Sequence, residues 1–232
     1  MSAKVITPQQ IQQATIILKC GDEEGSAFFI SDTLVLTARH VIIDAIDENE
    51  KIFAILPNLG ANSKPIICNL LGHGGEGLDI ALIEVPIQIS PFPLPLFRGQ
   101  VRYNAHWETF GFPFSQQISG NRYLGSVRKT NIDKPYDIEL TTDSIDNKLD
   151  YSGLSGSPLV IDNEVYGVIT YSIVDGFGAI SILKIAEFLD LYQIPYRVQK
   201  VLEDLPDNFN DLDSIVPNEQ TLALLDNQLV SG

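Results

Sequence analysis

The sequence predicts an all-β fold of two six-stranded antiparallel β-barrels with short helices near its amino- and carboxyl-terminal ends. Three observations lead to this prediction. Short apolar, β-branched or aromatic runs recur along the chain, clusters of Gly, Asp, Asn and Pro separate them, and a proline-rich passage divides the runs into six and six. Closure into barrels removes the exposed edges that such sheets would otherwise have.

The first element is a short helix, because Thr7 can cap it, Pro8 suits its first turn and Gln10 is placed to complete a capping box. The first barrel is expected within about 14–86, with strands over 14–20, 26–30, 33–37, 51–56, 65–71 and 80–85. The connector 87–104 is rich in proline, which holds backbone extended and removes ladder donors. It is therefore not expected to form a central strand.

The second barrel is expected within about 105–184, with strands over 106–111, 121–128, 136–141, 157–162, 164–172 and 178–183. Residues 182–193 change to helical spacing, which predicts a helix whose apolar stripe seals a barrel. The final segment, 199–232, is acidic and interrupted by proline, so it is expected to be a tail or linker. Its apolar patch at 221–225 could instead form a short docking helix.

Charge and cysteine content narrow the classes of partner. A net charge of −15 over 232 residues disfavours binding to nucleic acid or to anionic lipid surfaces and suits a basic polypeptide. No signal peptide or membrane-spanning apolar run is visible. Cys20 and Cys68 are therefore expected to be buried, reduced thiols in a cytoplasmic protein.

Three separated segments carry residue types that form a nucleophilic site. His40 ends "TARH", Asp79 lies in "GLDIALIEV" just before a strand, and Ser155 lies in "GLSGSP". Singly, each fits a strand end or a turn. Together they meet a chemical requirement, because a serine hydroxyl needs a base, histidine suits that role near neutral pH, and a carboxylate orients the imidazole. The N–H groups of Gly153 and Ser155 would face the developing oxyanion.

On these segments the chain resembles the trypsin/chymotrypsin-like serine peptidases. "TARH", "DIAL" and "GLSGSP" stand where that family has its histidine, aspartate and serine motifs, and "WETFGFP" and "EVYGVITYS" resemble family strands. The resemblance runs from about residue 14 to 192, with a compact spacing similar to that of bacterial members and HtrA-type proteases, but without a PDZ module. It implies a trypsin-like peptidase domain over 1–198, with His40, Asp79 and Ser155 catalytic and with no metal or cofactor.

The resemblance also implies which residues bind a protein substrate as an extended peptide: Leu149, Asp150, Thr170, Tyr171, Ser172 and Gly178. Thr170 would hydrogen-bond Asp79, and Ser172 and Gly178 would frame the specificity pocket. Leu149 at the pocket floor favours an apolar substrate side chain, whereas the adjacent Asp150 favours Lys or Arg. Both alternatives stay open.

Leu154 departs from the family pattern, since many secreted relatives have there an aspartate that pairs with a newly freed amino terminus. Activation by clipping the amino terminus is therefore not expected. By analogy, the chain is a regulatory serine endopeptidase of a bacterial signalling or antiviral defence system that cleaves one protein partner. The alternative is a catalytically inactive or partner-activated module that binds extended peptides, because Leu154 could leave the oxyanion hole unformed.

Overall fold

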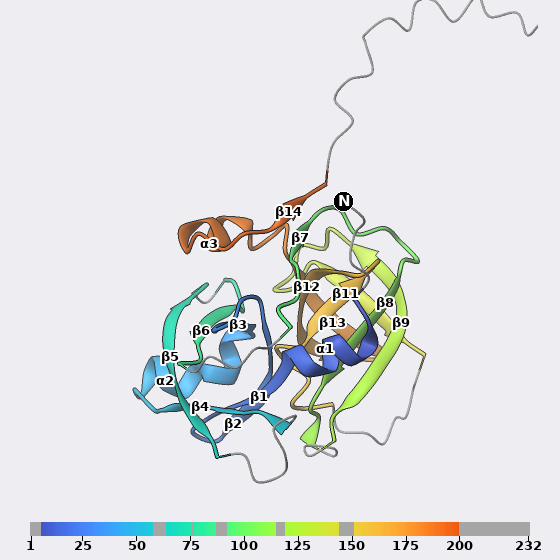
Figure 1. Cartoon of the computed structure of the whole chain (residues 1–232). Coiled ribbons are helices and arrows are strands. Elements are labelled where there is room, and N and C mark those ends of the chain that lie inside the picture. The colour runs from blue at the N-terminus through green and yellow to red at the C-terminus, as the bar shows by residue number, and fades with distance from the viewer. Residues whose placement is uncertain are drawn as a thin grey trace, which may run out of the picture. The chain divides into compact units, whose positions relative to one another are not determined.

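The fold is taken from a computed structural model, which describes residues 6–57, 64–75, 77–86, 92–114, 119–143 and 151–199. Strands close into two separate six-stranded antiparallel barrels, which confirms the predicted fold class (Figure 1). The predicted tail beyond residue 199 and its patch at 221–225 lie outside the described residues. Within the described part, no helix is long and apolar enough to cross a membrane.

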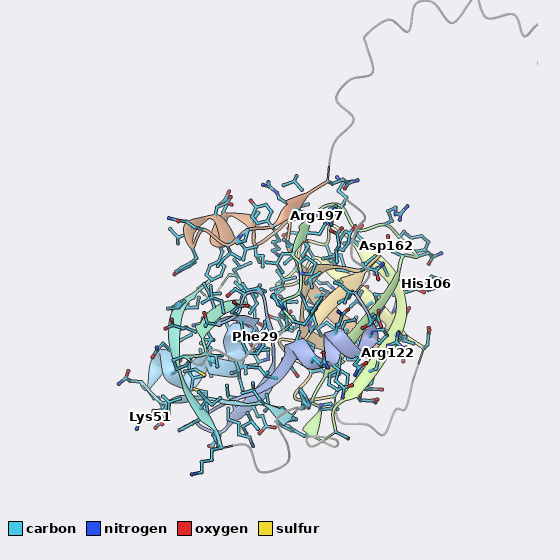
Figure 2. The ribbon with its side chains drawn as sticks, in the orientation of Figure 1. Phe29, Lys51, His106, Arg122, Asp162 and Arg197 are labelled. Atoms are coloured by element: carbon cyan, nitrogen blue, oxygen red, sulfur yellow. The ribbon has the colours of Figure 1, made fainter. Side chains whose placement is uncertain are left out.

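The first barrel closes in the order β1-β2-β3-β6-β5-β4. Its strands are β1 (Thr15–Cys20), β2 (Glu23–Phe29), β3 (Leu34–Thr37), β4 (Ile52–Ile55), β5 (Ile66–His73) and β6 (Ala81–Glu84). Successive side chains of a strand point to opposite faces, so Ile16, Leu18 and Cys20 of β1 share one apolar core. Figure 2 shows Phe29 inside this barrel and Lys51 at its outer surface.

The second barrel closes in the order β10-β13-β12-β11-β8-β9. Its strands are β8 (His106–Gly111), β9 (Asn121–Thr130), β10 (Ile138–Thr142), β11 (Pro158–Ile161), β12 (Glu164–Ile173) and β13 (Gly176–Ser181). The ring of Phe177 meets the edges of Trp107 and Tyr123, with centroids 5.9 and 6.0 Å apart. Strand β13 begins earlier than predicted because Asp175, at φ +65°, closes a tight hairpin that pairs Ile173 with Gly176.

The short helices lie at both ends of the described chain. Helix α1 (Pro8–Ala14) has the predicted capping box: Gln10 N–H donates to Thr7 Oγ1 at 3.3 Å, and Thr7 N–H donates to Gln10 Oε1 at 2.9 Å. Helix α3 spans only Ala186–Leu191, which is shorter than the predicted 182–193. The preceding residues form turns instead, because Ser181 bonds Asp137 at 2.6 Å and accepts the Lys184 N–H at 3.0 Å.

The connector between the barrels contains one short element that the sequence did not predict. Strand β7 (Phe97–Arg98) pairs in parallel with β14 (Arg197–Val198), close to the end of the described chain. Arg197 also forms an ion pair with Glu164 of β12. The described part of the connector is therefore not a strand of either barrel and contributes to a small separate sheet.

A shared apolar cluster joins the two barrels. It is formed by buried side chains from both barrels and from the helices, among them Ile11, Ile17, Phe28, Leu36, Phe110, Val168, Ile180 and Leu189. Close packing of this kind resists relative movement of the elements that it joins. The strand ends that face each other across the cluster are thus held in place, and they carry the site described below.

Cys20 and Cys68 are both buried and free, which confirms the predicted thiols. Burial raises the pKa of Cys68 to about 11 and also raises the pKa of Cys20. A raised pKa keeps the thiol protonated to higher pH, and the thiolate is the reactive form. We therefore expect neither cysteine to react with iodoacetamide at about pH 8 in the folded protein, and both to react in urea, as measured by mass spectrometry. Equal labelling rates in the two conditions would contradict this.

Candidate active site

His40 and Asp79 lie at neighbouring strand ends of the first barrel. His40 is in the short 3-10 helix η1 (Arg39–Ile42), which follows β3 and leads into helix α2 (Ile43–Asp47), and Asp79 comes just before β6. Strands β3 and β6 are paired, with Thr37 opposite Ala81, so the two side chains meet at one edge. The sequence predicted both residues, and the structure brings them together.

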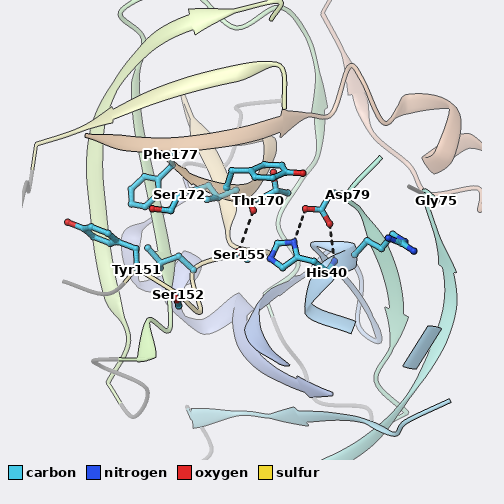
Figure 3. Close-up of a pocket in the computed structure, with 13 residues that line it drawn as sticks. His40, Gly75, Asp79, Tyr151, Ser152, Ser155, Thr170, Ser172 and Phe177 are labelled. Atoms are coloured by element: carbon cyan, nitrogen blue, oxygen red, sulfur yellow. Dashed lines mark hydrogen bonds and ion pairs between the residues drawn. The ribbon is translucent and has the colours of Figure 1, made fainter. Parts of the chain in front are cut away.

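Two hydrogen bonds join His40 to Asp79, one from the imidazole and one from the backbone (Figure 3). His40 Nδ1 lies 2.8 Å from Asp79 Oδ2, and the His40 backbone N–H donates to Asp79 Oδ1 at 2.9 Å. A carboxylate only accepts, so Nδ1 carries the hydrogen, and in the neutral imidazole Nε2 is then the acceptor. The Asp79 side chain is 12% exposed and that of His40 is 43% exposed, so the pair is shielded on the aspartate side and open on the histidine side.

Ser155 comes from the second barrel and lines the same cavity as His40 and Asp79, which has a volume of about 420 Å³. It lies on the turn that precedes β11. Its Oγ donates to the backbone carbonyl of Thr170 at 3.4 Å and forms no hydrogen bond with His40. The three predicted residues thus share one cavity, and the serine hydroxyl points to the Thr170 carbonyl. Rotation to another staggered rotamer is the motion that redirects it.

The backbone of residues 153–157, which we call the 153–157 loop, leaves two amides unpaired. The amides of Leu154, Gly156 and Ser157 donate to backbone carbonyls at 2.7–3.1 Å. By contrast, the N–H groups of Gly153 and Ser155 donate to no partner among the described contacts. These are the two donors that the sequence assigned to an oxyanion hole, and both are free to receive an acceptor.

The peptide that leads into Gly153 is held in one orientation. Phe114 N–H donates to the Ser152 carbonyl at 2.8 Å, and the N–H of a trans peptide points away from its carbonyl. The Gly153 amide is therefore directed away from Phe114. Gly153 has φ +96°, and an added Cβ would lie 2.5 Å from the Phe112 carbonyl, so glycine is required here.

Ser26 of β2 fastens the 153–157 loop to the first barrel. Its N–H donates to the Ser155 carbonyl at 2.8 Å, and its Oγ donates to the Gly153 carbonyl at 2.7 Å while accepting the Phe112 N–H at 3.0 Å. Gly156, at φ +90°, lies so close to Ser26 that an added Cβ would be 1.9 Å from the Ser26 carbonyl. Ser26 is fully buried, and no pattern in the sequence pointed to it.

Leu154 anchors the same loop on its other side. Its side chain is 1% exposed and lies in the apolar core of the second barrel, which also contains Trp107 and Phe177. On this side the 153–157 loop is thus held by apolar packing. The amides on either side of Leu154 keep the arrangement described above.

Three of the six residues that the resemblance assigned to substrate binding lie at the cavity. Thr170, Tyr171 and Ser172 of β12 line the cavity. The predicted hydrogen bond from Thr170 to Asp79 is not formed: Thr170 Oγ1 is buried without a partner, and the oxygens of Asp79 accept from His40. Thr170 instead contributes its carbonyl, to the hydroxyl of Ser155.

The pocket wall differs from the one expected. Gly178 does not line the cavity: it pairs with Tyr171, and an added Cβ would lie 2.7 Å from the Tyr136 ring. The wall is formed by Phe177 and Tyr151, whose rings meet at 88° with centroids 5.3 Å apart. The tight hairpin after β12 causes this difference, because it sets Phe177 opposite Ser172. Leu149 and Asp150 lie outside the described residues.

Comparisons with known proteins give a fold but no sequence relative. No protein-family model matches the chain, and no curated protein matches it significantly in sequence. Among solved structures, the Rv3671c protease in an inactive form has a TM-score of 0.61 at 18% identity, covering 80% of this chain and 91% of that one. A serine-to-alanine mutant of Rv3671c from M. tuberculosis H37Rv, also inactive, has a TM-score of 0.61 at 18% identity, covering 84% and 93%.

The crystal structure of Deg5 has a TM-score of 0.62 at 19% identity, covering 81% of this chain and 93% of that one. The chain therefore has the trypsin-like fold that HtrA- and Deg-type serine proteases share. The structural similarity establishes the fold. At this low sequence identity, the chemistry depends on the residues of the site itself.

Replacing Ser26 by alanine tests its role as an anchor. Ser26→Ala leaves the Gly153 carbonyl and the Phe112 N–H without their partner in a fully buried place. We expect the free energy of unfolding to fall by about 1–3 kcal/mol, measured by urea denaturation. The matched control is Ser126→Ala on β9, where the half-buried hydroxyl makes no hydrogen bond among the described contacts and the change should stay within about 0.5 kcal/mol. Equal losses in both variants would show that Ser26 is no anchor.

Proposed function

We propose that this chain is a serine endopeptidase that uses Ser155 as nucleophile, His40 as general base and acid, and Asp79 as the orienting carboxylate. The observation that carries the proposal is the 2.8 Å contact of His40 Nδ1 with Asp79, in a cavity that Ser155 also lines. The unpaired amides of Gly153 and Ser155 add the donors that acyl transfer requires. The aspartate, histidine and serine thus occur together with backbone N–H groups that could stabilise an oxyanion.

The reaction follows from these atoms. Ser155 Oγ attacks the carbonyl carbon of the scissile peptide bond, and its proton passes to His40 Nε2. The carbonyl oxygen becomes an oxyanion, which the amides of Gly153 and Ser155 stabilise. Collapse breaks the C–N bond, His40 returns the proton to the leaving amine, and the acyl group remains on Ser155. Water, activated by His40, then hydrolyses that ester and restores the hydroxyl.

The proposed substrate is a protein segment held as an extended strand along Thr170, Tyr171 and Ser172. The net charge of −15 supports a partner that is basic overall and argues against nucleic acid or an anionic membrane surface. The aromatic wall of Tyr151 and Phe177 supports an apolar side chain in the specificity pocket. In biological terms, we propose a cytoplasmic regulatory protease of a bacterial signalling or antiviral defence system.

A second candidate is a module that becomes active only with a partner, or that binds extended peptides without cleaving them. It is favoured by one observation, the hydrogen bond from Ser155 Oγ to the Thr170 carbonyl, which engages the hydroxyl away from His40. A bound peptide that pairs with β12 would compete for carbonyl groups on this edge. Release of the hydroxyl toward His40 would then follow from binding.

Active-site labelling separates the two candidates. We expect a fluorophosphonate probe to label the wild-type chain and to leave Ser155→Ala unlabelled, because the probe reacts only with an activated serine. His40→Ala should slow the labelling about 10³-fold or more. Ser157→Ala is the matched control in the same loop, since its buried hydroxyl makes no hydrogen bond and its loss should change the labelling little. A folded wild-type chain that is not labelled would contradict the first candidate and favour the second.

A further inference from the structure

Arg39 is a half-buried cation in the cavity that contains His40, Asp79 and Ser155. Its Nε is buried and has no hydrogen-bond partner, and Arg39 forms no ion pair among the described contacts. Other arginines are neutralised by acidic side chains, namely Arg102 by Asp162, Arg122 by Glu108 and Arg197 by Glu164. Because withdrawing an unpaired charge from water is costly, an unpaired guanidinium in a cavity favours the binding of an anion.

Asp79 does not fill that role, although it lines the same cavity. Its Oδ1 accepts the His40 N–H and its Oδ2 faces His40 Nδ1, so both oxygens are engaged by the histidine. The chain carries 30 acidic residues against 15 lysines and arginines, yet Arg39 is paired with none of the acidic residues that the structure describes. The guanidinium therefore provides positive charge inside the cavity of an otherwise acidic protein.

The position of Arg39 indicates which part of a substrate it meets. Figure 3 shows Tyr151, Ser152 and Phe177 toward one end of the cavity and Gly75 at the other, with His40 and Asp79 between them. Arg39 directly precedes His40 in the chain and lines this cavity together with Gly75. Its charge thus belongs to the histidine side of the cavity, away from the aromatic wall.

Strand geometry relates this position to the substrate sequence. Successive side chains of an extended peptide point in opposite directions. If the residue whose carbonyl is attacked places its side chain against Tyr151 and Phe177, the residue just before it directs its side chain the other way. That direction leads to His40, Gly75 and Arg39.

We propose that Arg39 is a specificity-determining residue that binds the carboxylate of an aspartate or glutamate located immediately before the cleaved residue of the substrate. This inference rests on the proposed peptidase function and names a substrate class for it. The guanidinium offers several N–H donors in a planar fork that suits a carboxylate, which neutral or basic side chains cannot match. The preferred substrate is then a segment with one acidic residue next to an apolar one.

The test uses two fluorogenic peptides that differ only in Glu or Gln at that position, with leucine as the cleaved residue. The wild-type chain should cleave the Glu peptide with a kcat/KM about tenfold higher. Arg39→Gln should bring the ratio to about one, and Arg39→Glu should favour a matching Lys peptide. Arg128→Gln, which removes an exposed arginine of β9, is the matched control and should keep the wild-type ratio. A ratio measured within one variant is insensitive to loss of folded protein.

Binding separates this inference from the peptidase proposal. Labelled versions of the same peptides are titrated into Ser155→Ala, with and without Arg39→Gln, and followed by fluorescence anisotropy. Tighter binding of the Glu peptide that depends on Arg39 supports the inference even if no peptide is cleaved. Equal binding and equal cleavage of the two peptides by chains that retain Arg39 overturn the inference. A preference for the Glu peptide that survives Arg39→Gln overturns it as well.

Discussion

The hydrogen bonds of Ser26 connect the two halves of the site, because this one residue holds the 153–157 loop of the second barrel against a strand of the first. Strand β2 also pairs with β3, and His40 follows the end of β3. The separation of Ser155 from His40 is therefore set by backbone ladders and a buried hydroxyl. Flexible side chains contribute little to it, and the apolar cluster between the barrels keeps both strands in place.

Charge is distributed unevenly around this framework. The barrel interiors and the cluster between them are apolar, and Glu139 is the one buried charged side chain among the described residues. Within the cavity, Asp79 is shielded and hydrogen-bonded, whereas Arg39 has no acidic partner in the described part of the chain. In the proposed function, the carboxylate would orient the base and the cation would stay open to the substrate. Since the cavity is partly shielded from water, both interactions are stronger there than on the open surface.

Local patterns in the sequence were sufficient for much of this arrangement. Alternating runs predicted the strands, the capping box predicted α1, and three motifs identified residues that do share a cavity. What escaped prediction depends on contacts between distant segments. Ser26 acts through partners far along the chain, and Phe177 replaces Gly178 in the wall only because the turn before it is so tight. No sequence pattern pointed to Arg39, because its lack of a partner is a property of the folded cavity.

Leu154 has a consequence for how the site responds to its surroundings. A carboxylate in this place would hold the 153–157 loop through an ion pair, which weakens as salt screens it or as acid protonates it. The packing of the buried leucine involves no charge, so neither salt nor acid weakens it in this way. The loop should keep its shape over a wide range of acidity and ionic strength. Its apolar anchor weakens instead on cooling, as hydrophobic contacts do.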